Sequence, residues 1–387
     1  MFDGIISFAI NNKVSLIFYT VLILLIITFR HKLEWQGIAG LYKTTVGVKT
    51  MQTLSDKYAE WFRWLGYVGV GIGFLGMFAI VAMLIYGLWQ LVFQPTAPAV
   101  IAPVVPGFEI PGIGIHVPLI IGWLALFFVI VIHEFSHGVV SKSHKIPIKS
   151  SGLLVFGPLL GAFVEPDEKK MSKASDIVQY SVFAAGPFSN ILSAVVSLLL
   201  VIGVSALVGM MTVSTGIGLG AVGPESPAAL AGLEAGMIIT AVNNQTITTQ
   251  DDFLASLTTL REGEDITLHT QNNSYVVTAG PDTDPRTDKG LIGVSLRENY
   301  EPVVANWLFQ ATLLLQEFVL WLFILHLGIG LANLLPLGPV DGGRMIHTLF
   351  THLWGKERGE RRWKQLSLIT LVTILVLLIV PITRGFF

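Results

Sequence analysis

Cysteine is absent from the 387 residues of this chain. Disulfide bonds are therefore excluded, and so is a thiol nucleophile. Any metal ion that the protein binds must be held by nitrogen and oxygen ligands. The absence does not identify a cellular compartment, because many extracytoplasmic domains contain no disulfide.

Charged residues are also scarce. Asp, Glu, Lys and Arg make up 13% of the sequence, whereas 52% of it is hydrophobic, and the formal net charge of −2 implies no nucleic-acid partner. Apolar runs of about 20 residues mark helices that cross a lipid bilayer. We therefore expect a polytopic α-helical membrane protein with about six transmembrane helices, at residues 13–29, 66–93, 117–140, 177–210, 303–336 and 365–383.

Lysine and arginine are missing altogether from the connection at 94–116, whereas segments 30–64, 141–176 and 337–364 contain six basic residues each. Segment 211–302 contains four basic residues against twelve acidic ones. Because basic connections tend to stay in the cytoplasm, we expect the three basic segments there, and both termini and segment 211–302 outside it. The pattern predicts a multi-pass protein of the cell membrane.

Three connecting segments have a character of their own. Residues 33–64 mix polar and apolar residues and predict a helical hairpin or surface helix at the membrane interface. The Pro- and Gly-rich segment 94–116 predicts an extracytoplasmic loop. Residues 150–165 are apolar but short and interrupted by Gly157-Pro158, which predicts a membrane-associated β-hairpin packed beside a helix. An unpaired edge of this hairpin could accept a peptide as an added strand.

The run His133-Glu134-Phe135-Ser136-His137 lies inside the third apolar segment. On a helix the two histidines share one face with Glu134 beside them, which is the spacing that a zinc ion and a general base require. An ionisable residue near the middle of a bilayer helix costs about 2.5–3.5 kcal/mol on insertion scales, so three neighbouring titratable groups indicate a function. Catalytic zinc sites usually have three protein ligands and a water molecule, so one ligand is still missing.

Asp341 is the best candidate for the third ligand. It lies at the end of the fifth apolar segment, in a stretch whose prolines break the helix and whose glycines allow tight backbone turns. The charge pattern gives the third and fifth segments the same direction, so Asp341 is expected at the same cytoplasmic level as His133 and His137.

The chain changes character at residues 212–298, where Asp, Thr, Asn and Gln become common and short strands are expected. The run from Val222 to Asn244, which contains Ser226-Pro227-Ala228 and Gly236-Met237-Ile238-Ile239, resembles a PDZ domain of the bacterial and archaeal protease type. The resemblance implies a soluble α+β PDZ-like domain whose groove takes peptide ends by strand addition. Gly216–Gly220 would be its carboxylate-binding loop, or equally a plain linker.

Three motifs together resemble those of the site-2 proteases, a family of intramembrane zinc metalloproteases. They are His133-Glu134-Phe135-Ser136-His137-Gly138, Ala185-Gly186-Pro187-Phe188-Ser189-Asn190, and the stretch from Asn333 to Gly343 with its Asn-x-x-Pro and Asp-Gly-Gly patterns. The resemblance covers the third to fifth apolar segments and the inserted PDZ-like domain, which is most of the chain.

The resemblance implies a role for each matching residue. His133, His137 and Asp341 would bind Zn²⁺, and Glu134 would be the catalytic base. Asn190 and Asn333 would face the substrate backbone, although helix-packing hydrogen bonds explain these two almost as well. The implied activity is hydrolysis of peptide bonds in or near transmembrane segments of membrane proteins, as in regulated intramembrane proteolysis.

The expected organisation follows from these assignments, with the active site near the cytoplasmic face and the PDZ-like domain outside the cytoplasm. The partners are transmembrane protein substrates, the lipid bilayer, and peptide ends at the PDZ-like domain. Five regions are expected: an N-terminal two-helix region with interfacial segment and extracytoplasmic loop (1–116), the first part of the catalytic membrane core (117–210), the PDZ-like domain (211–300), the second part of the core (301–345) and a C-terminal transmembrane helix (346–387).

Two other classes of function remain open at this point. A catalytically silent PDZ scaffold would bind membrane-protein ends, although the presence of Glu134 argues against it. A zinc transporter would place polar ligands along several helices through the bilayer, whereas here they gather at one depth. His326, about 22 Å before Asp341 along a helix, is too far to share the zinc and is expected to pack or to form hydrogen bonds.

Overall fold

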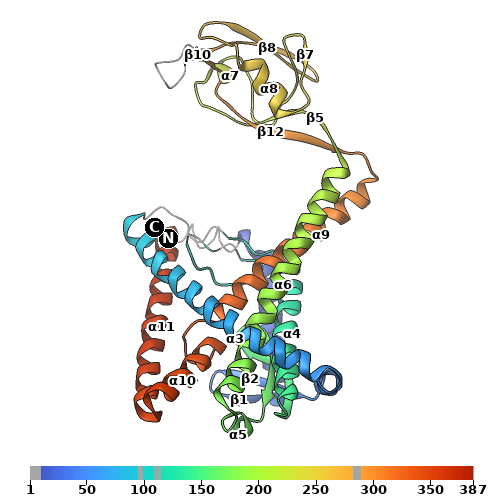
Figure 1. The fold of residues 1–387 in the computed structure, drawn as a ribbon. Helices are drawn as coiled ribbons and strands as arrows, with labels where there is room; N and C mark the ends of the chain where they lie inside the picture. Colours follow the sequence, from blue (N-terminus) through green and yellow to red (C-terminus); the bar gives the residue numbers. More distant parts are fainter. Residues whose placement is uncertain (1–9, 95–98, 109, 111–114, 282–288, 387) are drawn as a thin grey trace. The chain divides into compact units, whose positions relative to one another are not determined.

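The computed structural model describes residues 10–94, 99–108, 110, 115–281 and 289–386 (Figure 1). The chain divides into two compact units. The first contains the described residues up to Val201 and from Gln316 onward, and the second contains Ile202–Leu315. Part of the extracytoplasmic loop predicted at 94–116 and residues 282–288 of the predicted PDZ-like domain lie outside the described residues.

Six of the described helices are long and apolar enough to cross a membrane, with windows of 18 residues whose mean hydropathy is 1.9–2.8. By length and composition they confirm the predicted spans and make the chain a multi-pass membrane protein. The helices are α2 (Lys13–Phe29), α3 (Val48–Phe93), α4 (Leu119–Ser143), α6 (Asp176–Met210), α9 (Asn306–Ala332) and α11 (Lys356–Phe386). Helix α3 begins well before the predicted residue 66, and the non-helical backbone of Tyr58 (φ −130°) marks a kink in it.

A four-stranded antiparallel sheet belongs to the first unit, in the order β1-β2-β3-β4. Its strands are β1 (Glu34–Gln36), β2 (Ala39–Thr44), β3 (Ile148–Phe156) and β4 (Leu159–Pro166). The helical structure predicted for the beginning of 33–64 is therefore wrong. Residues 39–44 pair with 151–156, more than 100 positions away, and a local pattern carries no signal of such a partner.

Strands β3 and β4 form a hairpin that turns at Gly157 (φ 56°), within the segment where two short strands were expected. Its association with a membrane stays a prediction. Side chains tie the hairpin to β2: Ser150 Oγ donates to Glu165 Oε2 (2.6 Å), and Lys43 Nζ lies 3.4 Å from the same oxygen. The Ser150 hydrogen bond, followed by the charge of Lys43, lowers the pKa of Glu165, so this carboxylate stays ionised under mildly acidic conditions.

Glycines let the helices of the first unit approach closely. A Cβ atom at Gly73 of α3 would lie 3.1 Å from Met345 and 3.3 Å from Ala184, and one at Gly69 would lie 3.3 Å from Phe188. This is the close packing that small residues support in membrane helices. The resulting core joins α3, α4, α6 and α10 (Asp341–Trp354) through a cluster that includes Met77, Val140, Val182, Ala184, Leu334 and Met345.

The second unit contains a sheet in the order β12-β5-β6-β8-β9, with β7 paired to β6, and two short helices. Ser226 caps α7, and Thr249 with Asp252 forms a capping box at α8, so both helices start where side chains satisfy free backbone N–H groups. The elements are β5 (Thr212–Val222), α7 (Pro227–Leu230), β6 (Ile238–Val242), β7 (Gln245–Thr246), α8 (Gln250–Leu257), β8 (Asp265–Thr270), β9 (Ser274–Thr278), β10 (Gly280–Pro281), β11 (Gly290–Leu291) and β12 (Val294–Pro302).

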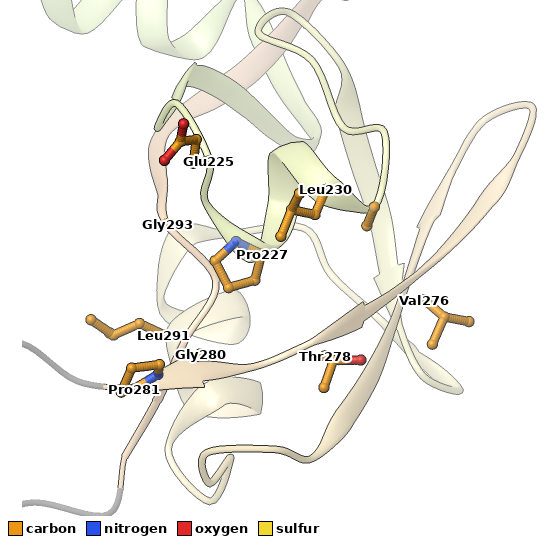
Figure 2. Close-up of a pocket in the computed structure, with 10 residues that line it drawn as sticks. Glu225, Pro227, Leu230, Val276, Thr278, Gly280, Pro281, Leu291 and Gly293 are labelled. Carbon is orange, nitrogen blue, oxygen red and sulfur yellow. The ribbon is translucent and has the colours of Figure 1, made fainter.

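Gly216–Gly220 does not form the predicted loop. These residues belong to β5, which pairs with both β12 and β6, and Ile217 and Leu219 are completely buried in the core of the unit. A cavity of about 650 Å³ lies elsewhere in the unit, between α7 and strands β9–β11 (Figure 2). Leu230 and Val276 line it and are largely exposed.

Candidate metal centre

Helix α4 places His133 and His137 one above the other on a buried face. Their ring centroids lie 4.8 Å apart, their Nε2 atoms lie 3.1 Å apart, and they are 6% and 9% exposed. The four-residue spacing is sufficient to produce this arrangement, because residues i and i+4 of a helix share a face. The predicted pairing of the two imidazoles is therefore present in the structure.

Asp341 comes to the histidines from the start of α10. After α9 ends at Ala332, the Gly342 N–H donates to the Asn333 carbonyl (2.7 Å), and a Cβ atom at Gly342 would collide with the Leu334 carbonyl. Only glycine tolerates this approach, which folds the carboxylate back toward α4. The position in the first turn of α10 also favours a negative charge.

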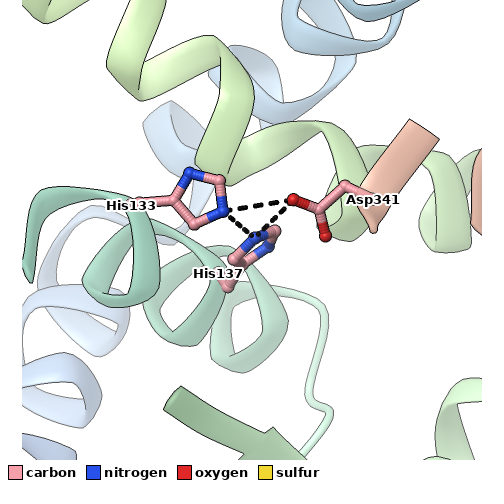
Figure 3. A group of neighbouring side chains, drawn as sticks. All are labelled: His133, His137 and Asp341. Atoms are coloured by element: carbon pink, nitrogen blue, oxygen red, sulfur yellow. Dashed lines mark hydrogen bonds and ion pairs between the residues drawn. The ribbon is translucent and has the colours of Figure 1, made fainter. Parts of the chain in front are cut away.

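One oxygen of Asp341 completes a triangle with the two histidines (Figure 3). Asp341 Oδ2 lies 3.1 Å from His133 Nε2 and 3.2 Å from His137 Nε2. In a tetrahedral site with metal–ligand bonds of 2.0–2.1 Å, neighbouring ligand atoms are separated by about 3.3 Å. The three atoms therefore have the spacing that a zinc ion requires, and they form a group that could hold a metal.

Hydrogen bonding prepares His137 for this role. Its Nδ1 lies 2.7 Å from the backbone carbonyl of Val182, an acceptor, so Nδ1 carries the proton and donates. Nε2 is then left with a lone pair, and it points at the other two candidate ligands. A ring nitrogen that donates to a carbonyl while the other faces the metal is the usual arrangement around metal-bound histidines.

Gly186 leaves room beside these atoms. A Cβ atom at this position would lie 2.6 Å from His133 Nε2 and closer still to His137 Nε2. A methyl group there would occupy the space that a metal ion bound to these atoms would need. The sequence identified Gly186 as part of the Gly186-Pro187 motif, but it did not predict that a side chain at this position would collide with both histidines.

The Glu134 carboxylate faces strand β4. Its Oε2 accepts a hydrogen bond from the backbone N–H of Val164 (2.9 Å). This contact joins the helix that carries the histidines to the edge strand of the first unit's sheet. The sequence did not predict it, because it depends on a strand that lies 30 residues away.

Asn190 and Asn333, the predicted substrate-binding residues, occupy different surroundings. Asn190 is completely buried between two imidazoles: its Nδ2 lies 3.1 Å from His133 Nδ1, and its Oδ1 lies 3.3 Å from His326 Nδ1. Asn333 is half-buried, and its side chain donates to the carbonyl of Ile329 one turn earlier (3.0 Å). The structure thus brings Asn190 to the candidate metal ligands, and substrate binding by either residue stays a prediction.

Comparison with known proteins agrees with this geometry. Residues 121–378 match the model of peptidase family M50. An uncharacterized protein of Methanocaldococcus jannaschii is 27% identical over 365 residues, which cover 91% of this chain and 88% of that protein. A proposed zinc metalloprotease of Clostridium acetobutylicum is 23% identical over 330 residues, which cover 68% of this chain and 95% of that protein.

The family model covers two thirds of the chain and includes all four residues of the candidate site. Both the membrane-spanning helices and the three converging side chains are features that a membrane metalloprotease needs. The chain belongs to peptidase family M50, the site-2 protease family of membrane metalloproteases.

Proposed function

We propose that the protein is an intramembrane zinc metalloprotease that cuts membrane proteins in or near their transmembrane segments, as in regulated intramembrane proteolysis. The observation that carries this proposal is the convergence of His133, His137 and Asp341, two of which lie in a helix long and apolar enough to span a membrane. Intramembrane ionisable groups are costly and are retained where they have a function.

The residues of the site have distinct roles in this reaction. His133, His137 and Asp341 would hold the zinc ion, which would supply Lewis-acid polarisation of the scissile carbonyl and lower the pKa of a water molecule beside it. Glu134 accepts a proton from the water molecule while the oxygen of that water bonds to the carbonyl carbon of the substrate. Glu134 then returns the proton to the amide nitrogen as the C–N bond breaks. The products are a new amine and a new carboxylic acid, which releases the second proton of the water to become a carboxylate.

Strand β4 is suited to present the substrate. It is at the edge of its sheet, and the N–H of Val164 points away from β3 toward Glu134. Because backbone groups alternate along a strand, those of Ala162 and Leu160 also point outward. A transmembrane helix must unwind before its peptide bonds can be attacked, and the unwound segment would add to β4 as a further strand.

The second unit is proposed to be a PDZ-like domain that binds peptide ends outside the cytoplasm. The basic segments 141–176 and 337–364 support a cytoplasmic position for the metal centre, and the single crossing of α6 between segment 141–176 and the second unit then supports the opposite side for this unit. Among the described residues, β12 and β9 are the edges of its sheet, and a cavity lies beside β9 (Figure 2). Both edges offer backbone groups for strand addition.

Metal removal tests the proposed activity. We expect the purified protein in lipid vesicles to cut a single-span substrate, to lose this activity on dialysis against a zinc chelator, and to regain it with stoichiometric zinc. Product formation is followed by gel electrophoresis. Cleavage that persists after complete zinc removal contradicts the proposal, and zinc flux into sealed vesicles without cleavage indicates a transporter instead.

Replacing Val164 by proline tests the contact between β4 and Glu134. Proline removes one N–H, and an outward-facing position on an edge strand tolerates it. Without this hydrogen bond the Glu134 carboxylate can turn away from the reacting atoms, and a misplacement of about 1 Å can cost about 10²-fold in rate, so we expect kcat to fall at least about tenfold with unchanged zinc content. Ala162→Pro is the matched control: it removes an outward N–H that does not bond to Glu134, so it should raise KM. Equal kcat in Val164→Pro and the unchanged protein would mean that the Val164 N–H does not hold Glu134 in position for the reaction.

A further inference from the structure

His326 is a buried histidine that the proposed reaction does not use. It is 2% exposed and lies in α9, a helix apolar enough to span a membrane. An imidazole at such a position needs a polar partner and a reason to be there. Its Nδ1 lies 3.3 Å from Oδ1 of Asn190, whose Nδ2 lies 3.1 Å from Nδ1 of His133. A continuous polar chain therefore runs from α9 through α6 to a candidate metal ligand on α4.

Metal binding determines the direction of both hydrogen bonds in the series His326–Asn190–His133. Nε2 of His133 faces Asp341 and His137, so it is the nitrogen that would bind the metal. A neutral imidazole bound through Nε2 carries its proton on Nδ1 and must donate from there. The amide oxygen of Asn190 then has to face His133, which a half-turn of the amide group achieves. The amide N–H in turn faces Nδ1 of His326, which must accept it.

We propose that His326 is a positioning residue of the metal centre, acting through Asn190 to orient the ring of His133 and to strengthen metal binding. The proposal rests on the metal site of the proposed function. As an acceptor, His326 favours the one amide orientation in which Asn190 Oδ1 accepts a hydrogen bond from the Nδ1–H of metal-bound His133. Outer partners of metal-binding histidines typically change metal affinity by about 10- to 100-fold when they are removed.

Zinc affinity of the full-length protein, measured by competition with a chromophoric chelator and without any substrate, tests this role. We expect His326→Leu to bind zinc about tenfold more weakly than the unchanged protein. His326→Asn places an amide oxygen near the position of Nδ1 and should restore most of the affinity. Asn190→Leu should weaken zinc binding by about 10- to 100-fold. Adding His326→Leu to it should cause little further loss, because Asn190→Leu already removes the link between His326 and His133.

Leu322→Ala is the control for packing. Leu322 lies one turn earlier on α9 and lines the same cavity of about 300 Å³ as His326. Its apolar side chain forms no hydrogen bond, so its truncation changes the packing and leaves the hydrogen bond between His326 and Asn190 in place. We expect its zinc affinity to be unchanged. Should His326→Leu fail to fold, His326→Gln replaces it. The glutamine amide reaches the position of Nε2 rather than that of Nδ1, so this variant keeps a polar side chain but loses the contact with Asn190. His326→Gln is then expected to bind zinc more weakly than His326→Asn.

The outcomes separate this inference from the function on which it rests. If the unchanged protein binds zinc and His326→Leu binds it equally well, or if His326→Asn is as weak as His326→Leu, the positioning role is wrong and the metal site stands. If the unchanged protein does not bind zinc, both the site and the inference are wrong.

Discussion

Gly186→Ala is expected to abolish zinc binding and, with it, proteolysis. The added methyl carbon would lie 2.6 Å from His133 Nε2 and closer still to His137 Nε2, in the space on which the candidate ligands converge. Neither histidine can move aside easily, because His137 donates to the Val182 carbonyl and His133 contacts Asn190. Metal analysis of purified Gly186→Ala should find less than a tenth of the zinc that the unchanged protein contains, because the added methyl group obstructs the space between the ligands.

Gly203→Ala is the matched control for this change. Gly203 belongs to the same helix, α6, and a Cβ atom there would meet none of the described residues within 4 Å. Both variants gain the same helix propensity and the same methyl group. Full zinc content in Gly203→Ala and little in Gly186→Ala is the predicted pattern. Full zinc content in both variants would mean that zinc binds elsewhere in the protein.

Glu134→Gln should keep its zinc and lose turnover by about 10²- to 10⁴-fold, which is the usual contribution of a general base. Glutamine retains an oxygen that can accept the Val164 N–H, so the contact with β4 is preserved while the proton acceptor is lost. Single-turnover cleavage of a membrane substrate measures the effect. An unchanged rate would remove Glu134 from the mechanism.

Asp341→Asn provides the contrast that separates a base from a ligand. Its amide is a poorer metal ligand than a carboxylate, so zinc content should fall together with activity. Glu168→Gln serves as the neutral control, because Glu168 is an exposed carboxylate of α5 (Glu168–Met171) that pairs only loosely with Arg344. Turnover of this control should match the unchanged protein.

The sequence contained enough information to predict the membrane helices and the three side chains of the candidate metal centre. Long apolar runs determine spans because a bilayer requires internally bonded helices of a minimum length. The spacing of His133 and His137 follows from helix periodicity alone. Asp341 was predicted from a motif and from a charge pattern that placed it at the same depth, and the structure brings its carboxylate to the two imidazoles.

The features that the sequence did not predict depend on contacts between distant segments. Strand β2 forms because residues 39–44 find β3, and nothing in their own composition requires it. Gly186 and the Val164 N–H act through neighbours that are 30 or more residues away. The glycines of Gly216–Gly220 indicated a loop. The residues instead form part of strand β5, and the alternating side chains of Ile217 and Leu219 fill the core of the second unit.

Mapping the cut peptide bond by mass spectrometry tests the central claim most directly. The zinc-loaded protein and Glu134→Gln are each reconstituted into lipid vesicles with the same single-span substrate. The zinc-loaded protein is predicted to generate new ends in or next to the apolar segment, and Glu134→Gln to generate none. Ends found only in soluble parts of the substrate, or the same ends from both proteins, would contradict an intramembrane metalloprotease.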